Sequence, residues 1–91
     1  MTNFHYAQNT NEMIEQIAYV LNSSNAVDCD AFAERAGASH RATVIVYNGQ
    51  NHQFIFNAYA DCEEFYGRRA AVMANEHANE ILQKAMNKAR K

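Results

Sequence analysis

Few residues of this chain are placed where they could do chemistry, and His77 is the first to consider. It lies in the segment ANEHANE, and Glu80 follows it by three residues. On a helix the two side chains would be one turn apart, close enough to share a proton or a metal ion. Two ligands are too few for a metal site, and no second pair has a matching spacing. We therefore expect His77 to be a histidine of a helix face that is satisfied by a neighbouring residue.

The two cysteines, Cys29 and Cys62, could act as nucleophiles or redox groups. Aspartates flank Cys29 on both sides, and three acidic residues surround Cys62. Nearby carboxylates oppose the thiolate, which is the reactive form of cysteine. We therefore expect two reduced, structural thiols in a cytoplasmic protein. The other histidines show no metal-ligand spacing with one another or with either cysteine: His5, His40 and His52.

The sequence contains none of the short motifs that mark common catalytic or cofactor sites. Neither the nucleophile elbow G-x-S-x-G nor the zinc motif H-E-x-x-H is present, and three glycines leave little room for a loop that cradles phosphates. No run approaches the roughly 18 apolar residues of a membrane helix. We expect a protein that is not an enzyme and that uses no metal, cofactor or membrane.

The composition is typical of one small globular domain spanning residues 1–91, because 48% of the residues are hydrophobic and 20% are charged. A chain of this size buries a modest share of its surface and gains from a partner. The formal net charge of −2 argues against general nucleic-acid binding, which needs a basic surface.

Two helices are predicted in the first forty residues. The first covers 10–22, where apolar residues recur at helical spacing and where Asn9 and Glu12 form a capping box. The second is a short helix over 28–36, which an aspartate caps and which Gly37 ends.

A β-hairpin is predicted from residues 42–47 and 52–59, since both segments are rich in β-branched and aromatic residues and Asn48-Gly49 is a strong turn signal. Of two turns considered, Gly49-Gln50 is favoured over Asn48-Gly49 because it sets apolar residues opposite one another. It places Thr43, Ile45, Tyr47, Phe54, Phe56 and Ala58 on one face, and Val44, Val46 and Ile55 on the other.

A long helix with a capping box of Asp61 and Glu64 is predicted to end the chain, its regular part beginning after Gly67. Its apolar stripe is longer than a two-stranded sheet can cover, so we expect the surplus to pack on the first helix or on a second copy of the chain. The candidate dimer-interface residues are Met73, His77, Ile81, Leu82 and Met86. The elements together predict an α+β fold of order α-α-β-β-α, with an antiparallel hairpin packed on helices.

The stretch AERAGASHRATVIVYNG, from Ala33 to Gly49, resembles the helix–turn–helix of LacI-type repressors. The resemblance implies a nucleic-acid-binding regulator that uses residues 30–48, and the basic C-terminal tail would supply further contacts. Its candidate contacts are Arg35, His40, Arg41, Lys84 and Lys88. A recognition helix must present polar groups to base edges, whereas residues 44–47 are an unbroken apolar run. Three consecutive β-branched residues also disfavour a helix, so the strand interpretation is preferred.

Acidic residues concentrate in the first part of the chain: Glu12, Glu15, Asp28, Asp30 and Glu34. With the apolar surface described above, they indicate a non-enzymatic protein-binding module, an inhibitor or regulator that occupies a surface of a larger protein. The carboxylates would meet a basic, nucleic-acid-binding surface and compete with its ligand. Phage-encoded inhibitors of host systems, including anti-CRISPR proteins, commonly have this form. The nucleic-acid-binding regulator is the alternative.

Overall fold

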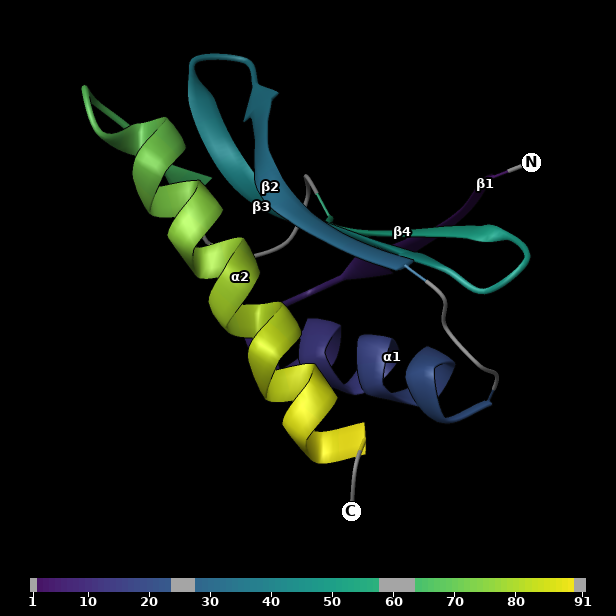
Figure 1. The fold of residues 1–91 in the computed structure, drawn as a ribbon. Coiled ribbons are helices and arrows are strands. Elements are labelled where there is room, and N and C mark those ends of the chain that lie inside the picture. Colours follow the sequence, from purple (N-terminus) through teal and green to yellow (C-terminus); the bar gives the residue numbers. More distant parts are fainter. Residues whose placement is uncertain (1, 24–27, 58–63, 90–91) are drawn as a thin grey trace.

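The computed structural model describes residues 2–23, 28–57 and 64–89, and it shows a sheet with two helices on one face (Figure 1). The elements are β1 (Thr2–Ala7), α1 (Thr10–Ser23), β2 (Asp28–Ala36), β3 (Ser39–Tyr47), β4 (Asn51–Phe56), β5 (Glu64–Phe65) and α2 (Ala70–Ala89). The strand order is β1-β4-β3-β2, and β5 pairs with one end of β3. The α+β class is confirmed, but the predicted order α-α-β-β-α is wrong, because the order is β-α-β-β-β-β-α.

The largest correction concerns residues 28–36, which form strand β2 and not a short helix. All nine residues of β2 pair antiparallel with β3. Gly37, with φ of 61°, adopts the left-handed conformation that the tight turn between these strands requires. The helix prediction failed because capping signals are local, whereas pairing along β3 decides the structure of this segment. The helix–turn–helix interpretation of residues 30–48 is wrong for the same reason.

Strand β1 is also unpredicted, since no element was expected before residue 10. It runs parallel to β4, which lies far away in the sequence. Its side chains alternate between the two faces of the sheet, with Phe4 and Tyr6 on one face and His5 and Ala7 on the other. Two parallel strands are joined only through a long crossover, so no local signal identifies β4 as the partner of β1.

The hairpin of β3 and β4 is confirmed, but its register lies between the two that were considered. Tyr47 pairs with Asn51, which leaves a three-residue loop over 48–50. Gly49 in this loop has φ of 104°. The Asn48 backbone N–H donates to the Gln50 carbonyl at 3.2 Å. Glycine therefore serves a longer turn than the two-residue turns that were considered.

This change of register by one residue moves every side chain of β4 to the opposite face relative to β3. Val44 pairs with Phe54, so that the buried apolar residues of both strands lie on one face. The predicted face that joined Ile45 with Phe54 is wrong. The face against the helices carries Val44, Val46, Phe54 and Phe56, whereas Thr43, Ile45, Tyr47 and Ile55 lie on the other face.

Helix α1 agrees with the predicted range to within one residue. The Asn9 side chain accepts the Glu12 backbone N–H at 2.9 Å, as the capping box predicts. The Glu12 carboxylate in turn accepts the Gln8 backbone N–H at 3.0 Å. In the described part of the chain, neither helix is long and apolar enough to cross a membrane.

Helix α2 begins at Ala70, after Gly67, and its buried stripe contains Ala74, Ala78 and Ile81. Of the predicted capping pair, Glu64 lies in β5, and Asp61 lies outside the described residues. Both helices contribute to one core with the sheet, and α1 packs directly against α2. Because α1 covers the surplus of the stripe, the length of the stripe does not argue for a second copy of the chain. The core contains Ala7, Met13, Ile17, Val20, Ala42, Val44, Val46, Phe54, Phe56, Ala78, Ile81 and Ala85.

Candidate protein-binding face

The candidate site is the face of the sheet away from the two helices, here called the open face. Directly paired residues on neighbouring strands share a face, so the register arranges the side chains in rows. One row consists of Thr2, Asn51, Tyr47 and Asp28, and the next consists of Phe4, Gln53, Ile45 and Asp30. Tyr6 paired with Ile55, and Thr43 paired with Phe32, follow along the strands.

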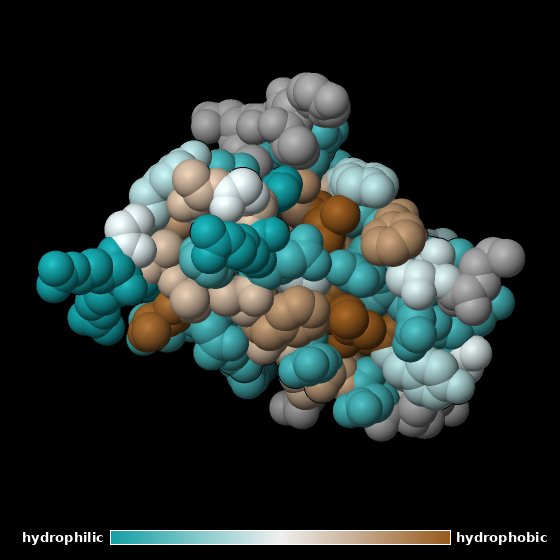
Figure 2. Space-filling view, turned by 90° about the horizontal axis from the view of Figure 1, so that it is seen from above, coloured by the Kyte–Doolittle hydropathy of each residue, from teal (hydrophilic) through white to brown (hydrophobic). Residues whose placement is uncertain are grey.

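Three aromatic side chains of the open face are unusually exposed, with 53% of Phe4, 56% of Tyr6 and 42% of Tyr47 accessible to solvent. The rings of Phe4 and Tyr6 are stacked, with centroids 6.5 Å apart. Figure 2 views the molecule from the side opposite α1 and shows hydrophobic residues lying between hydrophilic ones. A solvated sheet face normally carries polar residues, whereas exposed aromatic residues are enriched at protein–protein interfaces.

Charge on the open face is mainly negative, because β2 carries Asp28, Asp30 and Glu34 at positions of the same face. Glu34 accepts a hydrogen bond from the Gln53 amide at 3.2 Å. Within the described residues, the carboxylates of Asp28 and Asp30 form no hydrogen bond or ion pair. They are therefore available to a cation of a partner.

The guanidinium of Arg41, opposite Glu34 in the register, is engaged within the protein. Its Nε lies 3.7 Å from a carboxylate oxygen of Glu64, and its Nη1 donates to the Phe56 carbonyl at 3.0 Å. The side chain of Arg41 is mostly buried in these contacts. It therefore does little to offset the negative charge that β2 presents.

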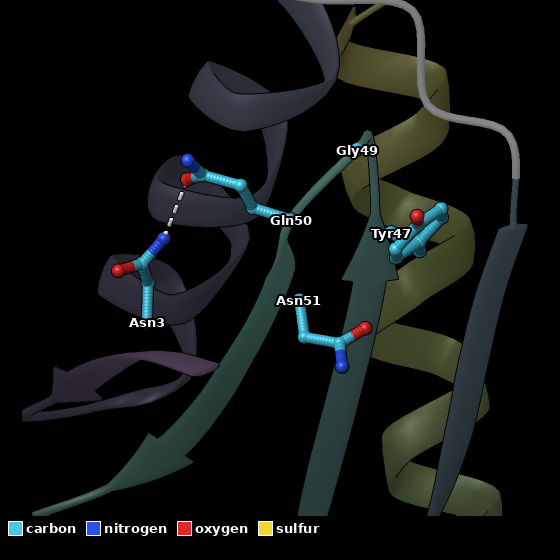
Figure 3. A pocket seen from close by; sticks show the side chains of 5 residues that line it. All are labelled: Asn3, Tyr47, Gly49, Gln50 and Asn51. Carbon is cyan, nitrogen blue, oxygen red and sulfur yellow. Dashed lines mark hydrogen bonds between the residues drawn. The ribbon is translucent and has the colours of Figure 1, made fainter. Parts of the chain in front are cut away.

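Two shallow hollows of about 340 Å³ each lie beside Tyr47. The first, at the tip of the β3–β4 hairpin, is shown in Figure 3, where Asn3 and Gln50 turn toward each other, away from Tyr47 and Asn51. The Asn3 amide donates to Gln50 at 2.9 Å there. The second hollow is lined by Asp28, Cys29, Asp30, Ile45, Tyr47 and Asn51. Tyr47 and Asn51 thus line both hollows, one of which is otherwise lined by amides and the other by carboxylates.

The five acidic residues predicted to bind a partner do not form one surface. Asp28, Asp30 and Glu34 belong to the open face. Glu12 and Glu15 lie on α1, in the other layer of the molecule (Figure 1). Glu12 caps α1, and Glu15 forms an ion pair with Lys88 of α2. The structure therefore reduces the acidic candidate surface to the three residues of β2.

The five candidate nucleic-acid contacts are also divided between the two layers. Lys84 and Lys88 lie on α2, where they pair with Glu80 at 3.1 Å and with Glu15, respectively. The other three lie on the β2–β3 hairpin: Arg35, His40 and Arg41. Since acidic residues accompany both groups, these side chains do not form a continuous basic surface.

The candidate dimer residues of α2 differ in exposure. Ile81 is 1% exposed and lies in the core, whereas Met73 is 42% exposed. Leu82 and Met86 are half-buried. His77 is half-buried too, with Nε2 at 3.3 Å from Thr10 Oγ1, and its ring contacts those of Phe56 and Phe65. The stripe therefore serves mainly the packing of the protein itself.

Cys29 is a free, half-buried thiol. Burial and the nearby Asp28 carboxylate raise the pKa of this thiol, which makes the reactive thiolate less accessible. Cys62 lies outside the described residues. Within residues 2–23, 28–57 and 64–89, no three histidine, cysteine, aspartate or glutamate side chains are grouped so that they could hold a metal ion.

Sequence reasoning missed the aromatic part of this face. Phe4 and Tyr6 alternate with His5 and Ala7, which is a strand signal that could have been read. Tyr47 was assigned to the hairpin, but its position beside Asp28 depends on β2 being a strand. No protein-family model, curated protein or solved structure matches this chain.

Proposed function

We propose that this protein is a non-enzymatic binding module whose open face occupies a basic surface of a larger protein. The observation that carries the proposal is the exposure of Phe4, Tyr6 and Tyr47 on a sheet face that also bears the exposed carboxylates of Asp28 and Asp30. Aromatic residues supply a large contact area, and the carboxylates select a cationic partner.

A protein partner suits this face better than a nucleic acid does. Stacking surfaces for single strands combine aromatic residues with cations that follow the phosphates. Here the aromatic residues lie beside carboxylates, and Arg41 is engaged by Glu64 and Phe56. Phosphates would be repelled, whereas lysine and arginine side chains would be attracted.

The size of the open face bears on how it binds. Strands lie about 4.8 Å apart and rise about 3.3 Å per residue, so four strands of about six residues cover roughly 400 Å². A standard interface covers about 800 Å² on each partner. A contact this small is strong only if a few side chains dominate it. Tyr47, which lines both hollows, is the best placed to dominate.

The proposed consequence of binding is inhibition or regulation. A basic surface on a larger protein commonly serves to hold nucleic acid. A module that covers such a surface with carboxylates competes with that ligand, as phage-encoded inhibitors of host systems would.

Site-specific photocrosslinking tests this function. A benzoylphenylalanine placed at position 47 would be compared with one at Gln83, an exposed position of α2. In lysate of the cells that make the protein, we expect position 47 to crosslink to one protein, to do so after nuclease treatment, and to do so less at high salt. Equal crosslinking from both positions, or products that disappear with nuclease, would contradict the proposal.

A further inference from the structure

A separate groove lies on the helix-covered side of the sheet, between α1 and the strands β1 and β4. Its volume is about 540 Å³, within the range of small-molecule sites, and its walls are predominantly apolar. Tyr19 and Val20 of α1 line one side, and His5 of β1 and His52 of β4 line the other. The groove belongs to the opposite face of the sheet from Tyr47, so an argument about it is independent of the proposed function.

The two histidines of this groove form a direct hydrogen bond. Nε2 of His5 and Nδ1 of His52 are 2.9 Å apart. The ring centroids are 5.2 Å apart, as expected when the two nitrogens point straight at each other. His5 also stacks on Phe54, with centroids 4.5 Å apart. Because the nitrogens face each other instead of converging on a third point, this geometry favours a shared proton over a chelated metal ion.

One proton must lie between the two rings, and this fixes what the outer nitrogens can do. When both rings are neutral, one outer nitrogen is a donor and the other is an acceptor. When the pair takes up one more proton, Nδ1 of His5 and Nε2 of His52 both become donors. Neither outer nitrogen has a hydrogen-bond partner among the described residues. The protonated pair therefore offers two free N–H groups and one positive charge.

Burial in the groove wall and the neighbouring His52 lower the pKa of His5. Both effects disfavour the charged form of His5 unless an anion compensates the charge. Other polar groups do not supply this anion. The Glu15 carboxylate on α1 is held by the Lys88 ammonium of α2, and the Tyr19 side chain is 74% exposed.

We propose that this groove binds a small carboxylic acid with an apolar body. The apolar part lies along Tyr19 and Val20, and the carboxylate accepts a hydrogen bond from one outer N–H of the His5–His52 pair as the pair takes up one proton. An uncharged ligand would not stabilise the positive charge of the protonated pair. Charge complementarity therefore favours a carboxylate.

Benzoate and octanoate are suitable probes, and benzamide is a matched control that differs from benzoate in lacking the charge. Titrations would be followed by calorimetry and by NMR at about pH 6 and about pH 8, where the carboxylates remain ionised. We expect benzoate or octanoate to bind with uptake of one proton. We also expect affinity to fall by roughly tenfold for each pH unit above the pKa of the pair.

His5→Phe keeps an aromatic ring over Phe54 and removes the hydrogen bond to His52, so it should reduce the pH dependence and weaken benzoate binding at least several-fold. His52→Gln provides a second variant if the first is unfolded, and Gln83→Ala is the control on α2. Equal binding of benzamide, binding that does not change with pH, or the absence of binding by the folded wild-type protein would overturn the proposal. None of these results bears on crosslinking from position 47.

Discussion

Tyr47 of β3 lies directly opposite Asp28 of β2 on the open face. An exposed aromatic ring and an exposed carboxylate are thus neighbours on this face. This pair joins the two properties of the face, since the ring provides contact area and the carboxylate provides charge selectivity. The first two predictions separate these contributions.

Tyr47→Ala should weaken binding of the partner identified by crosslinking without destabilising the protein. A dominant aromatic residue contributes about 2 kcal/mol, which corresponds to roughly thirtyfold in Kd. Isothermal titration and thermal unfolding of the variant would measure the two effects. The matched control is Tyr19→Ala, because Tyr19 is an exposed tyrosine of the other layer. Similar losses of affinity for both variants would place the interface elsewhere.

Asp28→Asn together with Asp30→Asn should lower the association rate by about tenfold at low salt, because opposite charges steer the encounter. The difference from the wild-type protein should vanish near about 1 M salt, where charges are screened over a few ångströms. Stopped-flow or surface-binding kinetics would show this. Glu76→Gln on α2 removes an exposed charge away from the face and should leave the rate unchanged. A salt-independent defect would indicate that the aspartates act through shape.

Phe54→Ala should lower the free energy of unfolding by about 3–5 kcal/mol, since Phe54 is fully buried. The same change at the exposed Phe4 should lower it by less than about 1 kcal/mol. Urea unfolding of the two variants compares them directly. The comparison of these two variants also tests the hairpin register, because a slip of one residue would take Phe54 out of the core. Equal effects would show that the register is incorrect.

Lowering the pH from about 8 should destabilise the protein through His5. Its pKa in the folded state is below the value of about 6.5 that it has when unfolded. The unfolded state therefore binds more protons as the pH falls through this window. The stability that neutral His5 contributes is fully present above the pKa of the unfolded state. It is lost progressively as the pH falls toward the pKa of the folded state. His5→Phe should flatten this dependence between about pH 7.5 and pH 5.5 in urea unfolding. An unchanged slope in the variant would exclude His5 as its source.

The sequence predicts α1 well because its signals are local. Asn9, Glu12 and the helical spacing of apolar residues lie within one segment, and the structure contains the expected cap. The local signals in β2 conflict. Its sequence DCDAFAERA contains alanines and a capping aspartate, which favour a helix, but its side chains also alternate between the two faces of a strand. Only the pairing with β3 decides between helix and strand, and that pairing is a tertiary interaction.

The candidate face shows the same division between local and distant information. The acidic residues of β2 are visible in the sequence, and three of the five predicted ones lie on the open face. The aromatic rows require the register of β1, β4, β3 and β2 at once, and a single residue of slip rearranges them. The His5–His52 pair likewise depends on the parallel pairing of β1 with β4.

The most direct test of the open face is to map the bound surface by NMR, using labelled protein and the partner that crosslinks to position 47. The proposal predicts that the amide shifts concentrate in β1, β4, β3 and β2, with the largest changes around Tyr47, Asp28 and Asn51. Changes concentrated on the exposed sides of α1 and α2, with the strand amides unmoved, would contradict it.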